Sequence, residues 1–283
     1  MVSNITSLKD YLNWVSITRR SNINILENDD FNIGNGLFNV YYRGQASVKW
    51  ELTPGIFRDC FKKNYSAEHD LLKKASCILW KELEHLPTYL DKLTYLQHYG
   101  MATRLLDVTF NPLVALYFAC LSYEVSDGVV YSGFKCETEN RVGAEIVAEY
   151  VFSRAWTDIG ASLINYSIEK NVQINEFLNP IFVYPSFNNP RLKSQKGAFV
   201  LCPLIKENPG GHVVPNREPL IDTPFFSSHK AVIPYKSKDS LLRELSILGV
   251  DEGNLYQSVS SRINTIIKEK KWEIERDDGL LFE

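Results

Sequence analysis

Residues 97–120 read QHYGMATRLLDVTFNPLVALYFAC and join a group of polar side chains to a continuous apolar run. Residues 113–119 are apolar on every face of a helix, which predicts a buried helix rather than an amphipathic surface helix. Four polar residues stand before this run: His98, Arg104, Asp107 and Thr109. Polar groups beside an apolar interior need partners, so four of them within twelve positions indicate a convergent network.

The segments on either side of this stretch predict both strands and helices. Residues 37–42, LFNVYY, are aromatic and β-branched and predict a strand that ends at Arg43-Gly44. Further strands are expected at 104–109, 129–131, 181–185, 198–201 and 230–234. Helices are expected at 8–15, 68–86, 89–98, 113–123, 159–174, 240–248 and 255–267. Loops are expected at 27–36, 187–197 and 208–224. Residues 146–152 fit either a strand or a helix.

Composition places the chain among ordinary packed globular proteins. Of its 283 residues, 45% are hydrophobic, and the formal net charge is -3, which argues against general affinity for nucleic acid. No window approaches the roughly 18 apolar residues of a membrane span, so we expect a cytoplasmic protein without a membrane partner. We expect an α+β fold in which helices flank a mixed, twisted β-sheet that could be split in two. Three parts are predicted: an N-terminal docking helix at 1–30, a core domain at 31–236 and a helical C-terminal appendage at 237–283 packed on the core.

Several catalytic and metal-binding motifs are absent from the sequence. It contains no GxGxxG, GxxxxGK[ST], HExxH or GxSxG pattern, which disfavours dinucleotide Rossmann, P-loop, zincin and nucleophile-elbow chemistry. The five cysteines lack paired metal spacing, so we expect reduced thiols, no metal site and no tightly bound cofactor.

Arg43 is the first candidate binding residue. It follows two tyrosines at a strand end, where its rigid guanidinium fork could face a phosphate or a carboxylate. The alternative is an internal salt bridge with Asp107 or a glutamate. Gly44 beside it allows a ligand or another backbone to come close, and we include Gln45 as a candidate binding residue.

His98 is the histidine that the pattern favours as a ligand contact. It stands at a predicted helix end before Tyr99-Gly100, where one ring nitrogen could bond a ligand hydroxyl and the other a backbone carbonyl. A structural histidine with satisfied hydrogen bonds explains the same position equally well.

Asp107 and Thr109 flank Val108 on a predicted strand and should therefore point to the same face. Together they could orient a ribose. Alternatively, Asp107 pairs with Arg104 or Arg43, and Thr109 caps the helix that begins near Pro112.

These motifs together resemble the FRG domain, over about residues 30–205. The matching residues are Tyr42-Arg43-Gly44, Gln97-His98-Tyr99-Gly100, Thr103-Arg104-Leu105-Leu106-Asp107, Asn111-Pro112 with Ala115, and Arg191 with Gln195 and Gly197 before Phe199. Residues 241–256, LLRELSILGVDEGNLY, are also similar to the segment after this domain in many members. The resemblance identifies the core as an FRG domain and implies a protein of bacterial or phage conflict systems, such as a phage-defence toxin.

The order of the motifs also resembles ADP-ribosyltransferases, which implies their fold and NAD as a co-substrate. By that resemblance Arg43 would bind the pyrophosphate and His98 the ribose hydroxyls, with Gln45, Arg104 and Thr109 as further cofactor contacts. Gln195 would lie near the reacting ribose, at the position of the family's catalytic glutamate, and Asp107 would orient groups or replace the missing acid. A glutamine cannot act as a carboxylate, so the usual mechanism does not transfer unchanged.

Two hypotheses about function result. The first is an NAD-utilising ADP-ribosyltransferase or NAD glycohydrolase in which Gln195, Asp107 and His98 act in catalysis on NAD and an unknown macromolecular acceptor. The second is a non-catalytic nucleotide-binding or protein-interaction module. The first hypothesis requires that Arg43 shares one cleft with these three residues.

Overall fold

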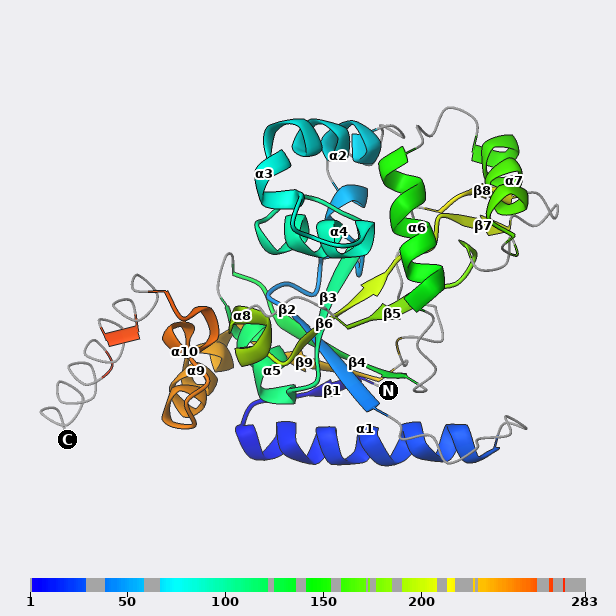
Figure 1. Cartoon of the computed structure of the whole chain (residues 1–283). Helices are drawn as coiled ribbons and strands as arrows, with labels where there is room; N and C mark the ends of the chain where they lie inside the picture. The colour runs from blue at the N-terminus through cyan, green and yellow to red at the C-terminus, as the bar shows by residue number, and fades with distance from the viewer. Residues whose placement is uncertain are drawn as a thin grey trace, which may run out of the picture.

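A mixed seven-stranded β-sheet crosses the molecule, and helices pack against it (Figure 1). The strands follow the order β1-β9-β4-β2-β3-β6-β5, and every neighbouring pair is antiparallel except β1 with β9, which is parallel. The predicted α+β fold with a mixed sheet is therefore confirmed. The computed structural model describes residues 2–28, 39–58, 67–121, 125–135, 141–153, 159–171, 173, 177–184, 190–207, 213–216, 226, 229–258, 265–266 and 272.

The elements have the following bounds. The strands are β1 (Val2–Asn4), β2 (Asn39–Gln45), β3 (Leu105–Thr109), β4 (Gly128–Lys135), β5 (Ile181–Val183), β6 (Gly197–Leu201), β7 (Ile205–Glu207), β8 (Val213–Pro215) and β9 (Lys230–Ile233). The helices are α1 (Leu8–Asn28), α2 (Ala67–Ile78), α3 (Trp80–Leu83), α4 (Tyr89–His98), α5 (Pro112–Cys120), α6 (Arg141–Ser153), α7 (Ile159–Lys170), α8 (Pro190–Ser194), α9 (Lys238–Ile247) and α10 (Glu252–Tyr256).

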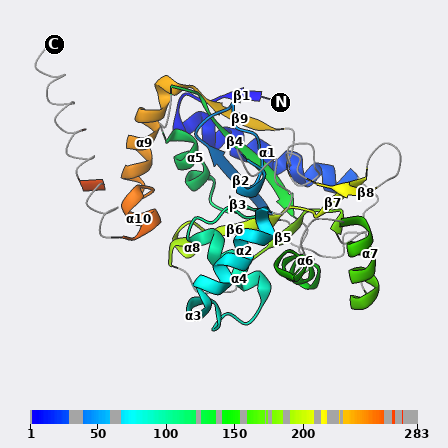
Figure 2. The same ribbon diagram turned by 90° about the horizontal axis from the view of Figure 1, so that it is seen from above.

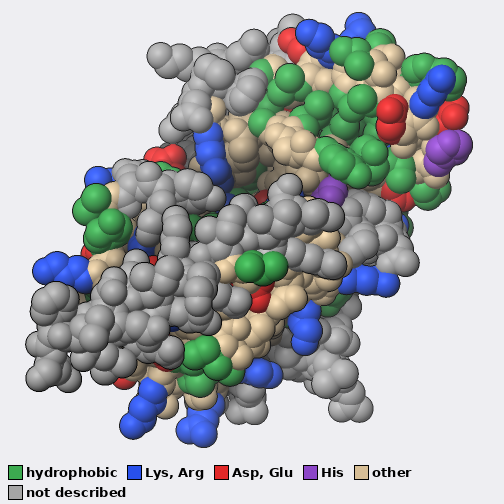
Figure 3. Space-filling model, turned by 90° about the vertical axis from the view of Figure 1, so that its left-hand side faces the viewer, with side chains coloured by type: hydrophobic (Ala, Val, Ile, Leu, Met, Phe, Trp, Pro, Cys, Tyr) green, Lys and Arg blue, Asp and Glu red, His purple; other side chains and the backbone are tan. Residues whose placement is uncertain are grey.

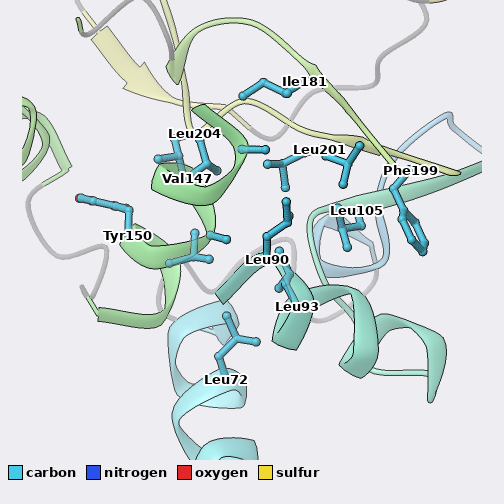
Figure 4. Close-up of a cluster of buried hydrophobic side chains, with 14 of the residues drawn as sticks. Leu72, Leu90, Leu93, Leu105, Val147, Tyr150, Ile181, Phe199, Leu201 and Leu204 are labelled. Atoms are coloured by element: carbon cyan, nitrogen blue, oxygen red, sulfur yellow. The ribbon is translucent and has the colours of Figure 1, made fainter. Parts of the chain in front are cut away.

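Two groups of helices share one face of the sheet. Tyr42 of β2 lies opposite Thr109 of β3, so both point to this face, as do Leu105 and Leu201 by strand alternation. Over β2 and β4 the buried cluster combines α1, α5, α9 and α10. Over β3, β6 and β5 a second buried cluster combines residues of α2, α4, α6 and α7 and includes Leu105 and Leu201 (Figure 4). Figure 2 shows α9 and α10 at the opposite end of the molecule from α6 and α7.

The outer side of the helices α2, α3 and α4 carries exposed hydrophobic side chains. Ile78, Trp80 and Tyr99 are each more than half exposed. Figure 3 shows hydrophobic side chains gathered over the upper part of the molecule, where Figure 1 places these helices. Ile78 ends α2, Trp80 begins α3 and Tyr99 follows α4, so the three side chains stand at helix ends at the rim of this group.

The buried helix at the centre behaves as its composition predicts. α5 has six of its nine residues buried, and its N-terminus is capped by Asn111, whose side chain accepts a hydrogen bond from the backbone N–H of Leu113. Pro112 fits the first turn because that position needs no backbone donor. The predicted cap by Thr109 is wrong, since Asn111 takes that role.

The N-terminal helix is longer than predicted. The apolar spacing indicates a helix at 8–15, whereas α1 continues to Asn28, within the predicted loop at 27–36. Tyr11, Trp14, Val15 and Thr18 are all buried, so a threonine continues the inward face of the helix past the last apolar position. The remainder of that predicted loop, from residue 29 on, lies outside the described residues.

Several short elements differ from the expectation. The predicted helix at 68–86 is divided at Leu79 into α2 and α3, and the ambiguous segment 146–152 lies within helix α6. α8 occupies part of the predicted loop at 187–197, and strand β8 part of the loop at 208–224. Strand β1 has no counterpart among the predicted elements.

The C-terminal helices are anchored by a buried lysine. Lys238, in the first turn of α9, is 1% exposed, and its Nζ donates to the carbonyl oxygens of Ala46 at 2.6 Å and Leu121 at 3.2 Å. Leu241 and Leu245 of α9 share a cluster with Leu116 of α5. α9 is thus fixed to the end of β2 and to α5, next to the face that carries the site.

Candidate functional site

A cavity of about 300 Å³ opens between the two helical groups, where β2 and β3 separate. Its polar lining includes Arg43, Gln97, His98, Asp107, Thr109, Arg191 and Gln195. Its apolar lining includes Tyr42, Val114, Phe118, Leu192 and Phe199. Small-molecule sites usually have volumes of about 300–1,000 Å³ and a mainly apolar lining with a few placed polar groups. The cavity is therefore large enough for a small ligand or for part of a larger one.

The separation of two strands makes room for this cavity. One register pair, Tyr42 with Thr109, joins β2 to β3, whereas seven pairs join β2 to β4. Next to the single pair, Arg43 spans the opening: its Nη1 donates to the backbone carbonyl of Asp107 at 2.6 Å and lies 3.9 Å from Asp107 Oδ2.

Arg43 is a nearly buried cation in the cavity wall. Its side chain is 14% exposed, and its buried Nε has no hydrogen-bond partner within the described residues. Burial lowers the pKa of Arg43 to about 10, and the Asp107 carboxylate opposes this shift. The guanidinium is therefore still charged at neutral pH. Arg43 contacts Asp107 and lines the cavity as well, so the two alternatives for this residue are compatible.

Asp107 is oriented by a short chain of hydrogen bonds. Gln97 Nε2 donates to Asp107 Oδ2 at 3.1 Å, and Thr103 Oγ1 donates to Gln97 Oε1 at 2.7 Å. Thr103 thereby fixes which end of the Gln97 amide faces the carboxylate. The Asp107 side chain is 60% exposed. Among the described residues that line the cavity, it is the only acidic one. Asp107 and Thr109 both line the cavity, as their expected common face implies.

His98 ends helix α4 at the cavity, beside a second arginine. Burial lowers the pKa of His98 below its usual 6.5, the charge of Arg191 lowers it further, and Asp107 acts in the opposite direction. The imidazole is therefore mainly neutral at pH 7, when it can both donate and accept a hydrogen bond.

Gln195 follows α8 and is tied to two other segments. Its backbone carbonyl accepts a hydrogen bond from Thr109 Oγ1 at 2.6 Å, and its Nε2 donates to the backbone carbonyl of Leu255 at 3.3 Å. Its side chain amide thus already has a contact with α10. Gln195 lines the same cavity as Arg43 and Asp107, which the enzyme hypothesis requires.

Two of the predicted cofactor contacts lie elsewhere. Arg104 is fully buried, and its Nε donates to both carboxylate oxygens of Glu68 at 3.0 Å. Gln45 is 4% exposed, with its Nε2 3.3 Å from the carbonyl oxygen of Glu51. Neither residue is part of the cavity lining, so their places do not fit direct contact with a ligand. Arg104 instead connects α2 to β3.

Gly44 is required by helix packing. A Cβ atom at this position would lie 1.8 Å from the backbone oxygen of Ala115 in α5. The segment that approaches Gly44 closely is therefore the backbone of α5. This contact brings α5, with Val114 and Phe118, against the cavity.

Gln97 and Arg191 are lining residues that the candidate set left out. Gln97 directly precedes His98 at the predicted helix end, and this position would have been a reason to include it as a candidate site residue. Arg191 is among the residues that carry the resemblance to the FRG domain, and it reaches the cavity from the short helix α8.

Comparison with protein families identifies part of the chain. Residues 38–128 match the family model of the FRG domain. The chain contains an FRG domain. Searches of curated proteins and of solved structures gave no match. The FRG match includes Arg43, His98 and Asp107, whereas Arg191 and Gln195 come from the chain after it. The likeness of the fold to ADP-ribosyltransferases stays a prediction, as does the division into three parts.

The cavity combines cationic, acidic and neutral polar groups beside an apolar wall. Arg43 and Arg191 can bind an anion, Asp107 can stabilise positive charge, and neutral His98 can accept a proton. Among the described residues, no group of three His, Cys, Asp or Glu side chains is placed to hold a metal ion. Within the same residues, no helix is both long and apolar enough to cross a membrane.

Proposed function

We propose that this cavity binds a nucleotide and that the protein uses NAD as a co-substrate, as an ADP-ribosyltransferase or an NAD glycohydrolase. The observation that carries the proposal is the presence of Arg43 and Arg191 in one cavity with Asp107 as its acidic residue. Two guanidinium groups suit a diphosphate, which accepts paired hydrogen bonds from them. The apolar wall, which includes Tyr42 and Phe199, suits the flat face of a base.

The proposed reaction breaks the bond between nicotinamide and ribose. Positive charge then develops on the ribose, nicotinamide leaves as a neutral base, and water or a macromolecular acceptor adds to the ribose carbon. Asp107 would stabilise the positive charge, and His98 would take the proton that the attacking group loses. Gln195 would contact the ribose through hydrogen bonds without carrying charge. The resemblance to FRG proteins suggests a conflict system as the setting of this activity.

A second candidate function is a nucleotide-binding module without turnover. It is favoured by the high exposure of the Asp107 carboxylate, 60%, because solvent weakens the electrostatic stabilisation of a charged intermediate. A glutamine also stands where ADP-ribosyltransferases carry their glutamate. The two candidates differ in one measurable step, the release of nicotinamide.

Replacement of Arg43 by glutamine is expected to weaken NAD binding by about 10- to 150-fold. A hydrogen bond to a charged group contributes about 1.5–3 kcal/mol, and 1.4 kcal/mol corresponds to a factor of ten. Calorimetric titration of NAD measures the effect, with Arg191→Gln as a second cavity variant. Arg243→Gln is the matched control, because this arginine pairs with Asp239 on the surface of α9. Equal affinity in wild type and both cavity variants, or no NAD binding by wild type, contradicts the proposal.

Nicotinamide release separates the enzyme from the binding module. The wild-type protein is incubated with NAD, and free nicotinamide and modified macromolecules are quantified beside an Asp107→Asn variant. We expect release by wild type and a loss of at least tenfold in the variant. NAD binding with no release by wild type supports the module instead.

The affinity for NAD is expected to rise as pH falls below 6.5. His98 is neutral at pH 7, and a bound diphosphate raises the pKa of its ring, so that binding takes up a proton at lower pH. For each unit by which the bound diphosphate raises the pKa of His98, the affinity for NAD at low pH increases by up to about tenfold. Titrations at pH 5, 6, 7 and 8 measure the slope, which should vanish in His98→Asn. If the affinity of His98→Asn for NAD changes with pH as strongly as that of wild type, a group other than His98 causes the pH dependence.

A further inference from the structure

The C-terminal helix α10 contacts the short helix that carries one wall of the cavity. The backbone carbonyl of Leu255 accepts hydrogen bonds from Ser194 Oγ at 2.9 Å and from Gln195 Nε2 at 3.3 Å. The guanidinium carbon of Arg191 lies 4.6 Å from the centre of the Tyr256 ring. α8 and the residue after it, Gln195, therefore meet α10 through three separate contacts, two of which involve residues that line the cavity.

We propose that Tyr256 is a positioning residue for the nucleotide site and that it holds the guanidinium of Arg191 in the orientation that binds the phosphate groups. The inference rests on the proposed nucleotide binding. Tyr256 itself is not among the cavity-lining residues, so it acts through Arg191.

The geometry of a guanidinium explains how one arginine can serve both contacts. Stacking uses the flat face of the group, whereas hydrogen bonds leave from the N–H donors at its edge. An aromatic ring on one face therefore does not compete with a phosphate at the edge. An arginine side chain also loses about 2 kcal/mol of rotamer entropy when it is fixed. A ring that fixes Arg191 before the ligand arrives reduces this loss during binding.

The charge of Arg191 acts inside the cavity. It contributes to the lowered pKa of His98, which lines the same space from helix α4. A movement of Arg191 would therefore change the interaction with an anionic ligand and also the protonation of His98. Tyr256 lies 65 positions after Arg191 in the chain, beyond the segment that matches the FRG family model. Helix α10 thus takes part in forming the site.

A double-mutant cycle distinguishes positioning from general stabilisation. NAD affinity is measured by calorimetry for wild type, Tyr256→Leu, Arg191→Gln and the double variant. We expect Tyr256→Leu to bind NAD about 2- to 5-fold more weakly, the size of a partly exposed cation–π contact. If Tyr256 acts through Arg191, the double variant should bind no more weakly than Arg191→Gln alone. Tyr256→Phe keeps the ring and should match wild type. Tyr235→Leu is the matched control, because this exposed tyrosine lies in the turn directly before α9 and does not line the cavity.

The inference is overturned if the losses of NAD affinity from the two single variants add up in the double variant. It is also overturned if Tyr256→Phe binds NAD as weakly as Tyr256→Leu. Thermal unfolding of each variant shows whether the fold is retained.

A measurement without nucleotide keeps this test separate from the proposed function. The modification of Arg191 by phenylglyoxal is followed by mass spectrometry of its peptide. Without the ring of Tyr256, the guanidinium should react several-fold faster than in wild type and in Tyr256→Phe. If wild type binds no NAD, the proposed function fails, while this rate still reports whether Tyr256 holds Arg191. Equal rates in all three proteins contradict the positioning role.

Discussion

Replacement of Arg104 by methionine is expected to lower the free energy of unfolding by about 3–5 kcal/mol. Arg104 is fully buried, bonded to the carboxylate of Glu68 and within 3.3 Å of the carbonyl oxygens of Cys202 and Pro203. Methionine fills a similar volume but leaves the Glu68 carboxylate buried without its cation. Two backbone carbonyls lose a donor as well. An uncompensated buried charge is among the most destabilising changes in a protein interior.

Urea unfolding of Arg104→Met and of the double variant Glu68→Leu/Arg104→Met tests this reasoning. The double variant removes both charges and should be clearly more stable than Arg104→Met, because the cost comes from the unpaired partner. Arg243→Met is the control, since its surface pair with Asp239 should contribute less than about 1 kcal/mol. Equal destabilisation in the single and double variants contradicts the assignment of the cost to Glu68.

Replacement of Gly44 by alanine is expected to destabilise the fold by about 3 kcal/mol or more. The added Cβ atom would lie 1.8 Å from the oxygen of Ala115 and 2.9 Å from the nitrogen of Ala119. Both are backbone atoms of α5, so no side chain can rotate away, and the whole helix must shift from β2. Overpacking by one methyl group in a core usually costs about 1–3 kcal/mol, and a contact with rigid backbone lies at or above that limit.

Thermal and chemical unfolding measure the effect, and Gly55→Ala is the matched control. A Cβ atom at Gly55 would meet its nearest atom, Ala102 Cα, at 3.4 Å, so a change below about 1 kcal/mol is expected there. Similar unfolding midpoints for both variants show that α5 can move at no cost. Because α5 also lines the cavity, NAD affinity should fall in Gly44→Ala and stay at the wild-type value in Gly55→Ala.

The elements with a strong local signal could be predicted from the sequence. The continuous apolar run predicts α5 as a buried helix, and the β-branched and aromatic run before Arg43 predicts most of β2. β1 and β8 have three residues each, too few for a periodic pattern. They are strands because of their partners, β9 and β7, which a local pattern does not show. The same limit applies to α8, whose five residues include Arg191.

The sequence suggested candidate residues that share one cavity, and it also suggested Arg104, whose partner lies far away in the sequence. Arg43, His98, Asp107 and Gln195 line one cavity, and their catalytic or binding roles stay predictions. Arg104 has the same local context of turn and strand as Asp107. Its partner Glu68 stands 36 positions earlier and has no feature that marks it as buried. A polar cluster beside a buried helix therefore indicates a network but not which member faces a ligand.

The parallel pairing of β1 with β9 constrains the order in which the molecule can assemble. Val2 pairs with Lys230, so this edge of the sheet closes only after most of the chain has left the ribosome. At about 5–20 residues per second, β1 waits for its partner for roughly ten to fifty seconds. For roughly the last five to twenty seconds of that time, from the synthesis of Lys135 to that of Lys230, β4 lacks its neighbour β9 and presents an open strand edge. Assembly of this protein in the cell therefore includes a period in which a central strand is exposed to other chains.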